Sequence, residues 1–98
     1  MRKTVAHIIS ILRDNLVFIK EKYHVDSVDI FGSYIRAEET AQSDIDILVT
    51  FTETPSLLKF IELENFLSDL LGIRVDLVMK DALKRNMRRN IIREARPV

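Results

Sequence analysis

The sequence predicts a two-layer α/β (α+β) domain with a small mixed sheet and helices packed mainly on one face. Helical and strand patterns alternate along the chain in the order helix, strand, helix, strand, helix, strand, helix. A helical stretch separates the second and third strand patterns, which predicts that these strands pair in parallel. A chain of 98 residues can build one modest core. We therefore expect a single domain over residues 1–98.

The first half of the chain predicts a helix, a strand and a shorter helix. Apolar residues recur at helical spacing over residues 4–22, which indicates an amphipathic helix. Residues 25–31 are rich in β-branched and apolar residues and are typical of a strand. Residues 33–39 predict a short helix with Ser33 as its cap, followed by a loose polar connection.

The second half begins with a strand, a crossover helix and a further strand. Residues 44–51 and 73–79 are largely apolar runs of strand length. Thr54 and Pro55 are the residue types that cap and begin a helix, and Gly72 is the type that ends one. The expected apolar face of this helix comprises Leu57, Phe60, Ile61, Phe66, Leu67, Leu70 and Leu71.

The last helical pattern, from residue 81 to about residue 95, concentrates positive charge. Residues 80–98 contain seven of the 15 basic and two of the 15 acidic residues, a net charge of +5 that the first 79 residues balance with −5. This asymmetry predicts that the basic segment meets a nucleotide, an acidic partner or the protein's own acidic face. No aromatic residues interleave with the basic ones, so we do not expect nucleic-acid binding. The expected apolar stripe of this helix comprises Leu83, Met87, Ile91 and Ala95.

The composition excludes several classes of site. The chain has no cysteine, which excludes a disulfide framework and a thiolate metal site. No apolar run approaches the roughly 20 residues of a membrane span, so we expect no membrane association. A soluble cytoplasmic protein is the simplest interpretation.

Three aspartates on two strand patterns indicate a metal site. Asp44 and Asp46 are separated by one apolar residue, so on a strand they project from the same face. Carboxylates held close together repel one another, and a divalent cation such as Mg²⁺ neutralises them. Asp76 interrupts the third strand and would be compensated by the same metal. Asp44 and Asp46 could instead form a solvated acidic edge of the sheet. Asp76 could instead form an ion pair with Arg74.

A second candidate site lies upstream of the aspartates. Gly32 and Ser33 follow an apolar strand and precede the short helix, which would aim backbone N–H groups at an anion such as phosphate. Arg36 falls near this position. Its alternative role is a surface ion pair with Glu38 or Glu39. A phosphate-binding turn beside paired carboxylates that bind metal is typical of active sites for phosphoryl or nucleotidyl transfer.

These residues carry a family resemblance that covers nearly the whole chain. Gly32-Ser33, Arg36 and the run Ser43-Asp44-Ile45-Asp46 resemble the signature of the polymerase-beta-like nucleotidyltransferases. More narrowly, the chain resembles the minimal nucleotidyltransferases (MNT), the antitoxins of HEPN–MNT toxin–antitoxin pairs. The resemblance implies a nucleotidyltransferase-like fold.

The resemblance also implies roles for the motif residues. Asp44, Asp46 and Asp76 would hold two Mg²⁺ ions and carry catalysis, with Asp76 helping to deprotonate the acceptor. The implied nucleotide-binding residues are Gly32, Ser33, Arg36 and Ser43.

The implied reaction is transfer of AMP from ATP to a tyrosine hydroxyl of a HEPN toxin, within a homo- or hetero-oligomer. Two alternatives stay open. The protein could neutralise its partner by binding alone, without turnover. It could instead transfer a nucleotide to a small hydroxylated molecule, although a chain of this length has no second domain to enclose one.

Overall fold

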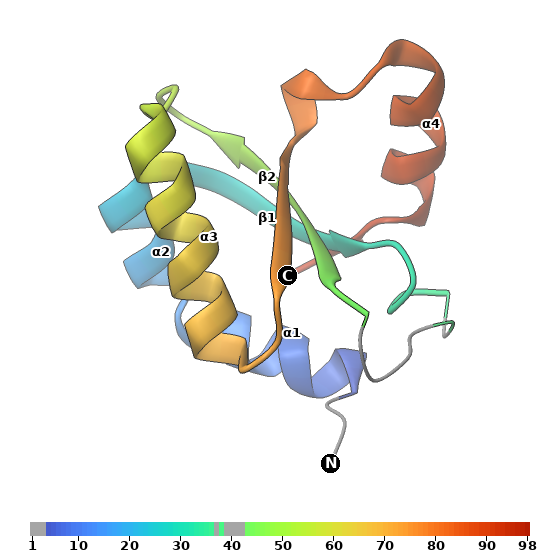
Figure 1. The fold of residues 1–98 in the computed structure, drawn as a ribbon, viewed down its shortest axis with the longest axis horizontal. Coiled ribbons are helices and arrows are strands. Elements are labelled where there is room, and N and C mark those ends of the chain that lie inside the picture. The colour runs from blue at the N-terminus through green and yellow to red at the C-terminus, as the bar shows by residue number, and fades with distance from the viewer. Residues whose placement is uncertain (1–3, 37, 39–42) are drawn as a thin grey trace.

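The computed structural model describes residues 4–36, 38 and 43–98 (Figure 1). Its elements, in chain order, are α1 (Val5–Asp14), α2 (Leu16–Tyr23), β1 (Val25–Phe31), β2 (Ile45–Phe51), α3 (Leu57–Leu71), β3 (Val75–Met79), the 3₁₀ helix η1 (Lys80–Ala82), α4 (Arg85–Glu94) and β4 (Arg96–Pro97). The predicted α+β class is confirmed.

The strands form a mixed sheet in the order β3-β2-β1-β4. β1 pairs antiparallel with both β2 and β4, whereas β2 and β3 pair in parallel. The parallel pair requires a crossover, and α3 supplies it. The short strand β4 was not predicted, because the two residues Arg96 and Pro97 pair with β1 without carrying a strand pattern of their own.

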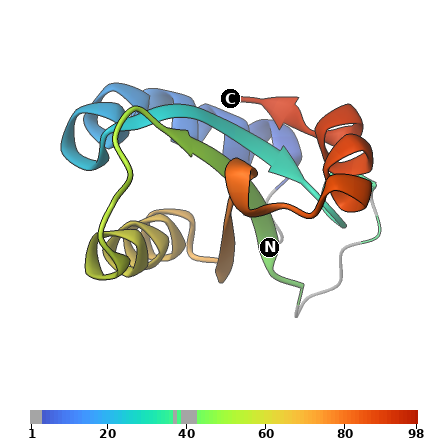
Figure 2. The same cartoon turned by 90° about the horizontal axis from the view of Figure 1, so that it is seen from above.

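The core lies between the sheet and the first three helices. A single cluster of buried side chains joins α1, α2 and α3 to β1, β2 and β3. Its most deeply buried members are Ile8, Leu12, Ile19, Ile30, Ile45, Ile47, Val49, Leu63, Leu67 and Leu71. α4 contributes no buried residue and lies apart from the other helices (Figures 1 and 2).

The predicted helix over residues 4–22 is two helices that meet at Asn15. The side-chain amide of Asn15 donates to the carbonyl of Ile11 at 2.8 Å, and its backbone N–H bonds to the carbonyl of Leu12. A side chain that binds the backbone in this way competes with the regular helical ladder. The single-helix prediction is therefore wrong at this residue, although both halves bury the expected apolar stripe.

The predicted helix over residues 33–39 is also wrong in its described part. Residues 33–36 form a tight turn in which the carbonyl of Gly32 accepts from the N–H groups of Ile35 and Arg36 at 3.0 and 3.1 Å. The N–H of Glu38 closes the next bond, to the carbonyl of Ser33. Residues 37 and 39–42, which include part of this predicted helix and its polar connection, lie outside the described residues.

α3 begins two residues later than the Thr54–Pro55 prediction. Ser56 is the cap, because its hydroxyl accepts from the N–H of Lys59 at 3.2 Å. Gly72 ends the helix with φ 67°, as predicted. Leu57, placed in the apolar face by the sequence, is 74% exposed. Leu67 and Leu71 are buried as predicted, and Leu63, which was not predicted, completes the buried ridge. No helix in the described ranges has the length and apolarity needed to cross a membrane.

The C-terminal segment differs most from its prediction. In place of one helix from residue 81, η1 covers Lys80–Ala82 and α4 begins at Arg85. Met87, from the expected apolar stripe, is 51% exposed. Leu83, Ile91 and Ala95 are only half-buried, because α4 extends beyond the sheet rather than packing on it (Figure 2).

Two α3 side chains bind the outer edge of β3. The Ser68 hydroxyl accepts from the N–H of Val75 at 3.0 Å, and the Glu64 carboxylate accepts from the N–H of Leu77 at 2.9 Å. These N–H groups belong to an edge strand, where ladder partners are lacking on one side. The bonds therefore fix β3, and with it the intervening Asp76, against α3.

We expect the Leu67→Ala variant to lose roughly 2–5 kcal/mol of unfolding free energy, because it leaves a cavity in the fully buried ridge of α3. Leu58→Ala on the same helix is the control. Its side chain is 80% exposed, so the loss should stay within about 0.5 kcal/mol. Urea denaturation of both variants measures the difference. Equal losses would show that the α3 ridge does not hold the core.

Candidate active site

Asp46 and Asp76 lie side by side on neighbouring strands. In the parallel β2–β3 pair Asp46 is directly opposite Asp76, and on the other side of β2 Phe31 is opposite Asp46. The residues before and after each aspartate are buried in the core, so alternation places both carboxylates on the opposite face of the sheet. Asp46 is half-buried and Asp76 is exposed. The register thus brings together two of the three predicted acids.

Asp44 lies one residue before β2, outside the strand in which it was predicted. Its negative charge raises the pKa of Asp46, so the two carboxylates interact electrostatically. Ser43, the residue before it, is half-buried. Within the described ranges, no group of three or more acidic or histidine side chains is gathered closely enough to form a metal site. The joint binding of metal by Asp44, Asp46 and Asp76 stays a prediction.

The carboxyl group of Asp46 has an unusual environment. Partial burial is the largest cause that raises its pKa, followed by the charge of Asp76 and a hydrogen bond with it, and then by the charge of Asp44. The positive charge of Arg36 lowers the pKa of Asp46. The result is a pKa of about 6 in place of 3.8. A proton or a cation at this position would relieve the repulsion between the carboxylates.

Gly32 packs directly against the Asp46 side chain. Its backbone has φ 82°, a conformation that L side chains rarely adopt. A Cβ atom there would lie 2.9 Å from the Asp46 Cγ and would overlap its Oδ2. Two independent constraints therefore require glycine at position 32. The backbone of the Gly32-Ser33 turn lies beside Asp46, as the motif predicted.

The Gly32-Ser33 turn lacks the helix that was expected to attract an anion. In the described residues 33–36 and 38 the chain forms a turn and no helix, so no helix dipole is seen there. Ser33 itself is half-buried. The binding of an anion by Gly32, Ser33 and Arg36 stays a prediction.

Arg36 forms two ion pairs. Its Nε donates to the Glu38 carboxylate at 3.2 Å, and its Nη1 donates to the Glu94 carboxylate at 2.8 Å. The Glu38 pair is the alternative role predicted from the sequence. Glu94, at the end of α4, was missed because it lies 58 residues away in the chain. The alternative ion pair between Arg74 and Asp76 is absent from the described residues.

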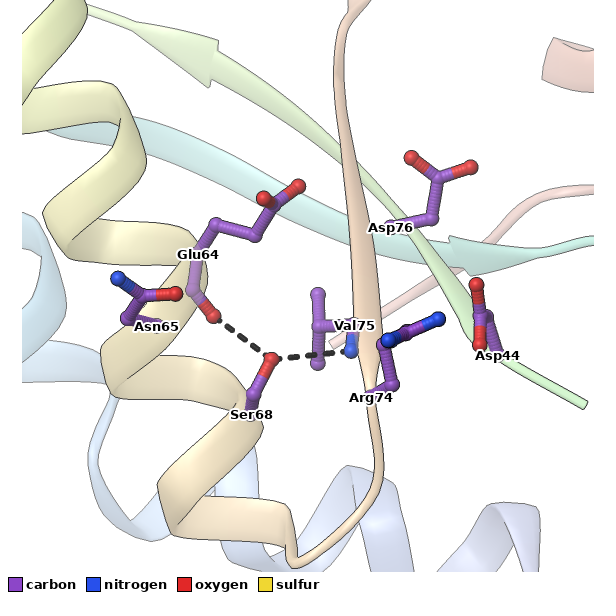
Figure 3. Close-up of a pocket in the computed structure, with 7 residues that line it drawn as sticks. All are labelled: Asp44, Glu64, Asn65, Ser68, Arg74, Val75 and Asp76. Carbon is purple, nitrogen blue, oxygen red and sulfur yellow. Dashed lines mark hydrogen bonds between the residues drawn. The ribbon is translucent and has the colours of Figure 1, made fainter. Parts of the chain in front are cut away.

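An open pocket of about 440 Å³ lies between α3 and β3 and is lined by two of the three predicted acids (Figure 3). Its lining combines side chains from α3, from β3 and from the residues just before β2 and β3, namely Asp44, Glu64, Asn65, Ser68, Arg74, Val75 and Asp76. The Ser68 hydroxyl also donates to the carbonyl of Glu64. The α3 residues could not be predicted as part of the site, since in the sequence they appeared only as the polar face of a helix.

Comparison with known proteins identifies the family. The nucleotidyltransferase domain model matches residues 12–98. The chain belongs to the nucleotidyltransferase domain family. It is 50% identical over 91 residues to the protein adenylyltransferase MntA of Thermococcus cleftensis, covering 93% of this chain and 92% of that protein.

Solved structures of nucleotidyltransferases share this fold. A toxin–antitoxin structure with AMP-PNP matches with a TM-score of 0.69 and 28% identity, covering 92% of this chain and 68% of that chain. A complex of a tri-AMPylated HEPN toxin with its MNT antitoxin from Shewanella oneidensis matches with a TM-score of 0.59 and 27% identity, over 92% of this chain and 64% of that one. The predicted nucleotidyltransferase fold and MNT resemblance are confirmed.

We expect Gly32→Ala to destabilise the protein more than Gly72→Ala. Both positions have positive φ, which costs an L residue about 1–2 kcal/mol, but only Gly32 adds the overlap with Asp46. Gly72 lies exposed at the end of α3. Thermal unfolding of the two variants is the measurement. A smaller loss at Gly32 would show that the turn does not press against Asp46.

We expect Asp46→Asn to stabilise the metal-free protein at pH 8 but not at pH 4. The pKa of Asp46 is higher in the folded protein than its ordinary value of 3.8, so the folded state holds the proton more tightly. Stability should therefore fall as the pH rises from about 4 through about 6, and asparagine removes this loss. Melting curves at both pH values, with exposed Asp26→Asn as control, measure it. An effect independent of pH would contradict the raised pKa of Asp46.

Proposed function

We propose that this nucleotidyltransferase transfers AMP from Mg-ATP to a tyrosine hydroxyl of a HEPN-type partner toxin and thereby acts as its antitoxin. The observation that carries the proposal is the line formed across the sheet by the Gly32 turn, Asp46 and Asp76. A relative named protein adenylyltransferase supports the reaction. A similar structure, in which an MNT antitoxin is bound to an AMPylated HEPN toxin, supports the partner.

The donor set fits Mg²⁺. The candidate ligands Asp44, Asp46 and Asp76 offer only carboxylate oxygens, which Mg²⁺ prefers. The raised pKa of Asp46 reflects burial first and then the negative charges of Asp76 and Asp44, and a cation would offset both costs of the ionised carboxylate. When bound, two Mg²⁺ ions would neutralise phosphate charge and polarise the α-phosphate.

The nucleotide side of the site is the Gly32 turn. Glycine lets the backbone approach the triphosphate closely, so Ser33 and the adjacent N–H groups can donate to the β- and γ-phosphates. Arg36 lies in the same turn and supplies positive charge to the leaving pyrophosphate. Ser43, next to Asp44, is the fourth proposed nucleotide-binding residue.

The acceptor side is β3. In transfer, the attacking oxygen and the leaving oxygen are roughly in line through the α-phosphorus. Asp76 is on the far side of Asp46 from Gly32 and is exposed, so it is placed to take the proton of the acceptor hydroxyl. The acceptor oxygen forms its bond to the α-phosphorus while the bond from that phosphorus to the β-bridging oxygen breaks, and pyrophosphate leaves.

The alternative is an antitoxin that silences its partner by binding alone. The exposed apolar side chains of α3 and α4 favour this candidate, since Leu57, Leu58 and Met87 are at least half exposed and could meet a partner.

The double variant Asp44→Asn/Asp46→Asn separates the two candidates. The changes keep side-chain volume and relieve repulsion, so the fold should survive, whereas transfer should fall by about a hundredfold or more because amides hold Mg²⁺ poorly. The assay incubates each protein with labelled ATP and a purified HEPN-type toxin. Label on the toxin and the toxin's own activity are both measured.

Loss of both label and neutralisation supports an AMPylating antitoxin. Asp26→Asn, an exposed aspartate change on β1, should retain both and serves as the control. A double variant that silences the partner as well as the parent does would instead establish the binding antitoxin.

A further inference from the structure

Glu94 connects α4 to the turn that carries the nucleotide motif. Its Oε1 accepts from Nη1 of Arg36 at 2.8 Å, the shorter of the two Arg36 ion pairs. The Glu94 side chain is 23% exposed, whereas that of Glu38 is 64% exposed. The more covered and shorter pair defines the guanidinium orientation more tightly, since exposed pairs are screened by water.

The position of Glu94 is unfavourable for α4 itself. It is the last residue of the helix, where the backbone dipole disfavours a negative charge. It is the one acidic residue of α4, and among the described residues it pairs with none of the helix's own arginines, Arg85, Arg88, Arg89 and Arg93. No α4 residue is buried, so core packing does not explain this carboxylate. Its contact with Arg36 does.

The two ion pairs leave Arg36 free to bind a further anion. A guanidinium has five N–H donors in a rigid planar fork. Glu38 engages one at Nε and Glu94 engages one at Nη1, and among the described residues no other side chain is recorded on the remaining donors of the two terminal nitrogens. Arg36 also lowers the pKa of Asp46, which places its charge within electrostatic reach of the acidic pair. Glu94 can therefore hold Arg36 without competing with a phosphate.

We infer that Glu94 is a positioning residue, which acts through Arg36 to fix the guanidinium for the β- and γ-phosphates of the nucleotide. The inference rests on the proposed function, in which the triphosphate occupies the Gly32 turn. It follows that the end of α4 and the nucleotide seat form one unit, although they are far apart in the sequence.

The test compares the Mg²⁺ complex of AMP-PNP with AMP, which lacks the β- and γ-phosphates. Calorimetry measures both affinities for the parent, Glu94→Ala, Glu94→Gln, Arg36→Ala and the double variant Arg36→Ala/Glu94→Ala. Asn90→Ala, one turn earlier on α4 and exposed, is the matched control.

Glu94→Ala should weaken AMP-PNP binding about tenfold, the usual effect of losing one charge-assisted hydrogen bond, and should leave AMP binding unchanged. Glu94→Gln, which keeps an oxygen acceptor, should lose less. The double variant should bind AMP-PNP no more weakly than Arg36→Ala alone, because both changes remove the same function. Asn90→Ala should match the parent.

Three results would overturn the inference. Equal weakening of AMP and AMP-PNP would indicate a general structural role for Glu94. Additive losses in the double variant would show that Glu94 does not act through Arg36, and unchanged AMP-PNP affinity in Glu94→Ala would remove the role altogether. A parent that binds no AMP-PNP would overturn the proposed function as well, which distinguishes that failure from the others.

Discussion

The close approach of the Gly32 backbone to the Asp46 carboxylate is the contact on which the site depends. It joins the end of β1 to an acid on β2, and it exists only because the antiparallel register sets Phe31 opposite Asp46. Any side chain at position 32 would meet that carboxylate. The same contact removes water from one side of Asp46 and so contributes to the burial that raises its pKa.

The second requirement is an accurately placed β3. A parallel edge strand has unpaired N–H groups on its outer side, and in this protein Ser68 and Glu64 of α3 bind them. The two bonded residues, Val75 and Leu77, flank Asp76. Because their N–H groups point to α3 and their side chains enter the core, Asp76 is held on the open face beside Asp46. The crossover helix thus positions an acid that it does not carry.

The separation of charge along the chain takes an unexpected form in three dimensions. The sequence predicts that the basic C-terminal segment meets an anionic group, and the acidic face of the protein was one candidate. In the described residues, the ion pair that joins the two parts has the opposite polarity. Arg36 comes from the acidic part of the chain and Glu94 from the basic segment. The arginines of α4 remain exposed and available to a partner or a solvent-borne anion.

The sequence by itself determined the class of fold, the first three strands and the strand positions of Asp46 and Asp76, which the structure places side by side. Asp46 and Asp76 could be predicted because each interrupts an apolar strand, where an uncompensated charge is costly. Gly72 could be predicted because a helix end with positive φ favours glycine. These features are local, so a short window of residues contains their physical cause.

Only the tertiary structure decided the break at Asn15, the loss of the helix after Ser33, the exposed position of α4 and the Arg36–Glu94 pair. The break at Asn15 and the loss of the helix after Ser33 depend on local competition between hydrogen bonds of similar energy. α4 has a helical pattern, but whether its stripe is buried depends on the room left on the sheet by α1, α2 and α3. The partner of Arg36 was beyond prediction, because a contact across 58 residues requires the whole fold to bring its two ends together.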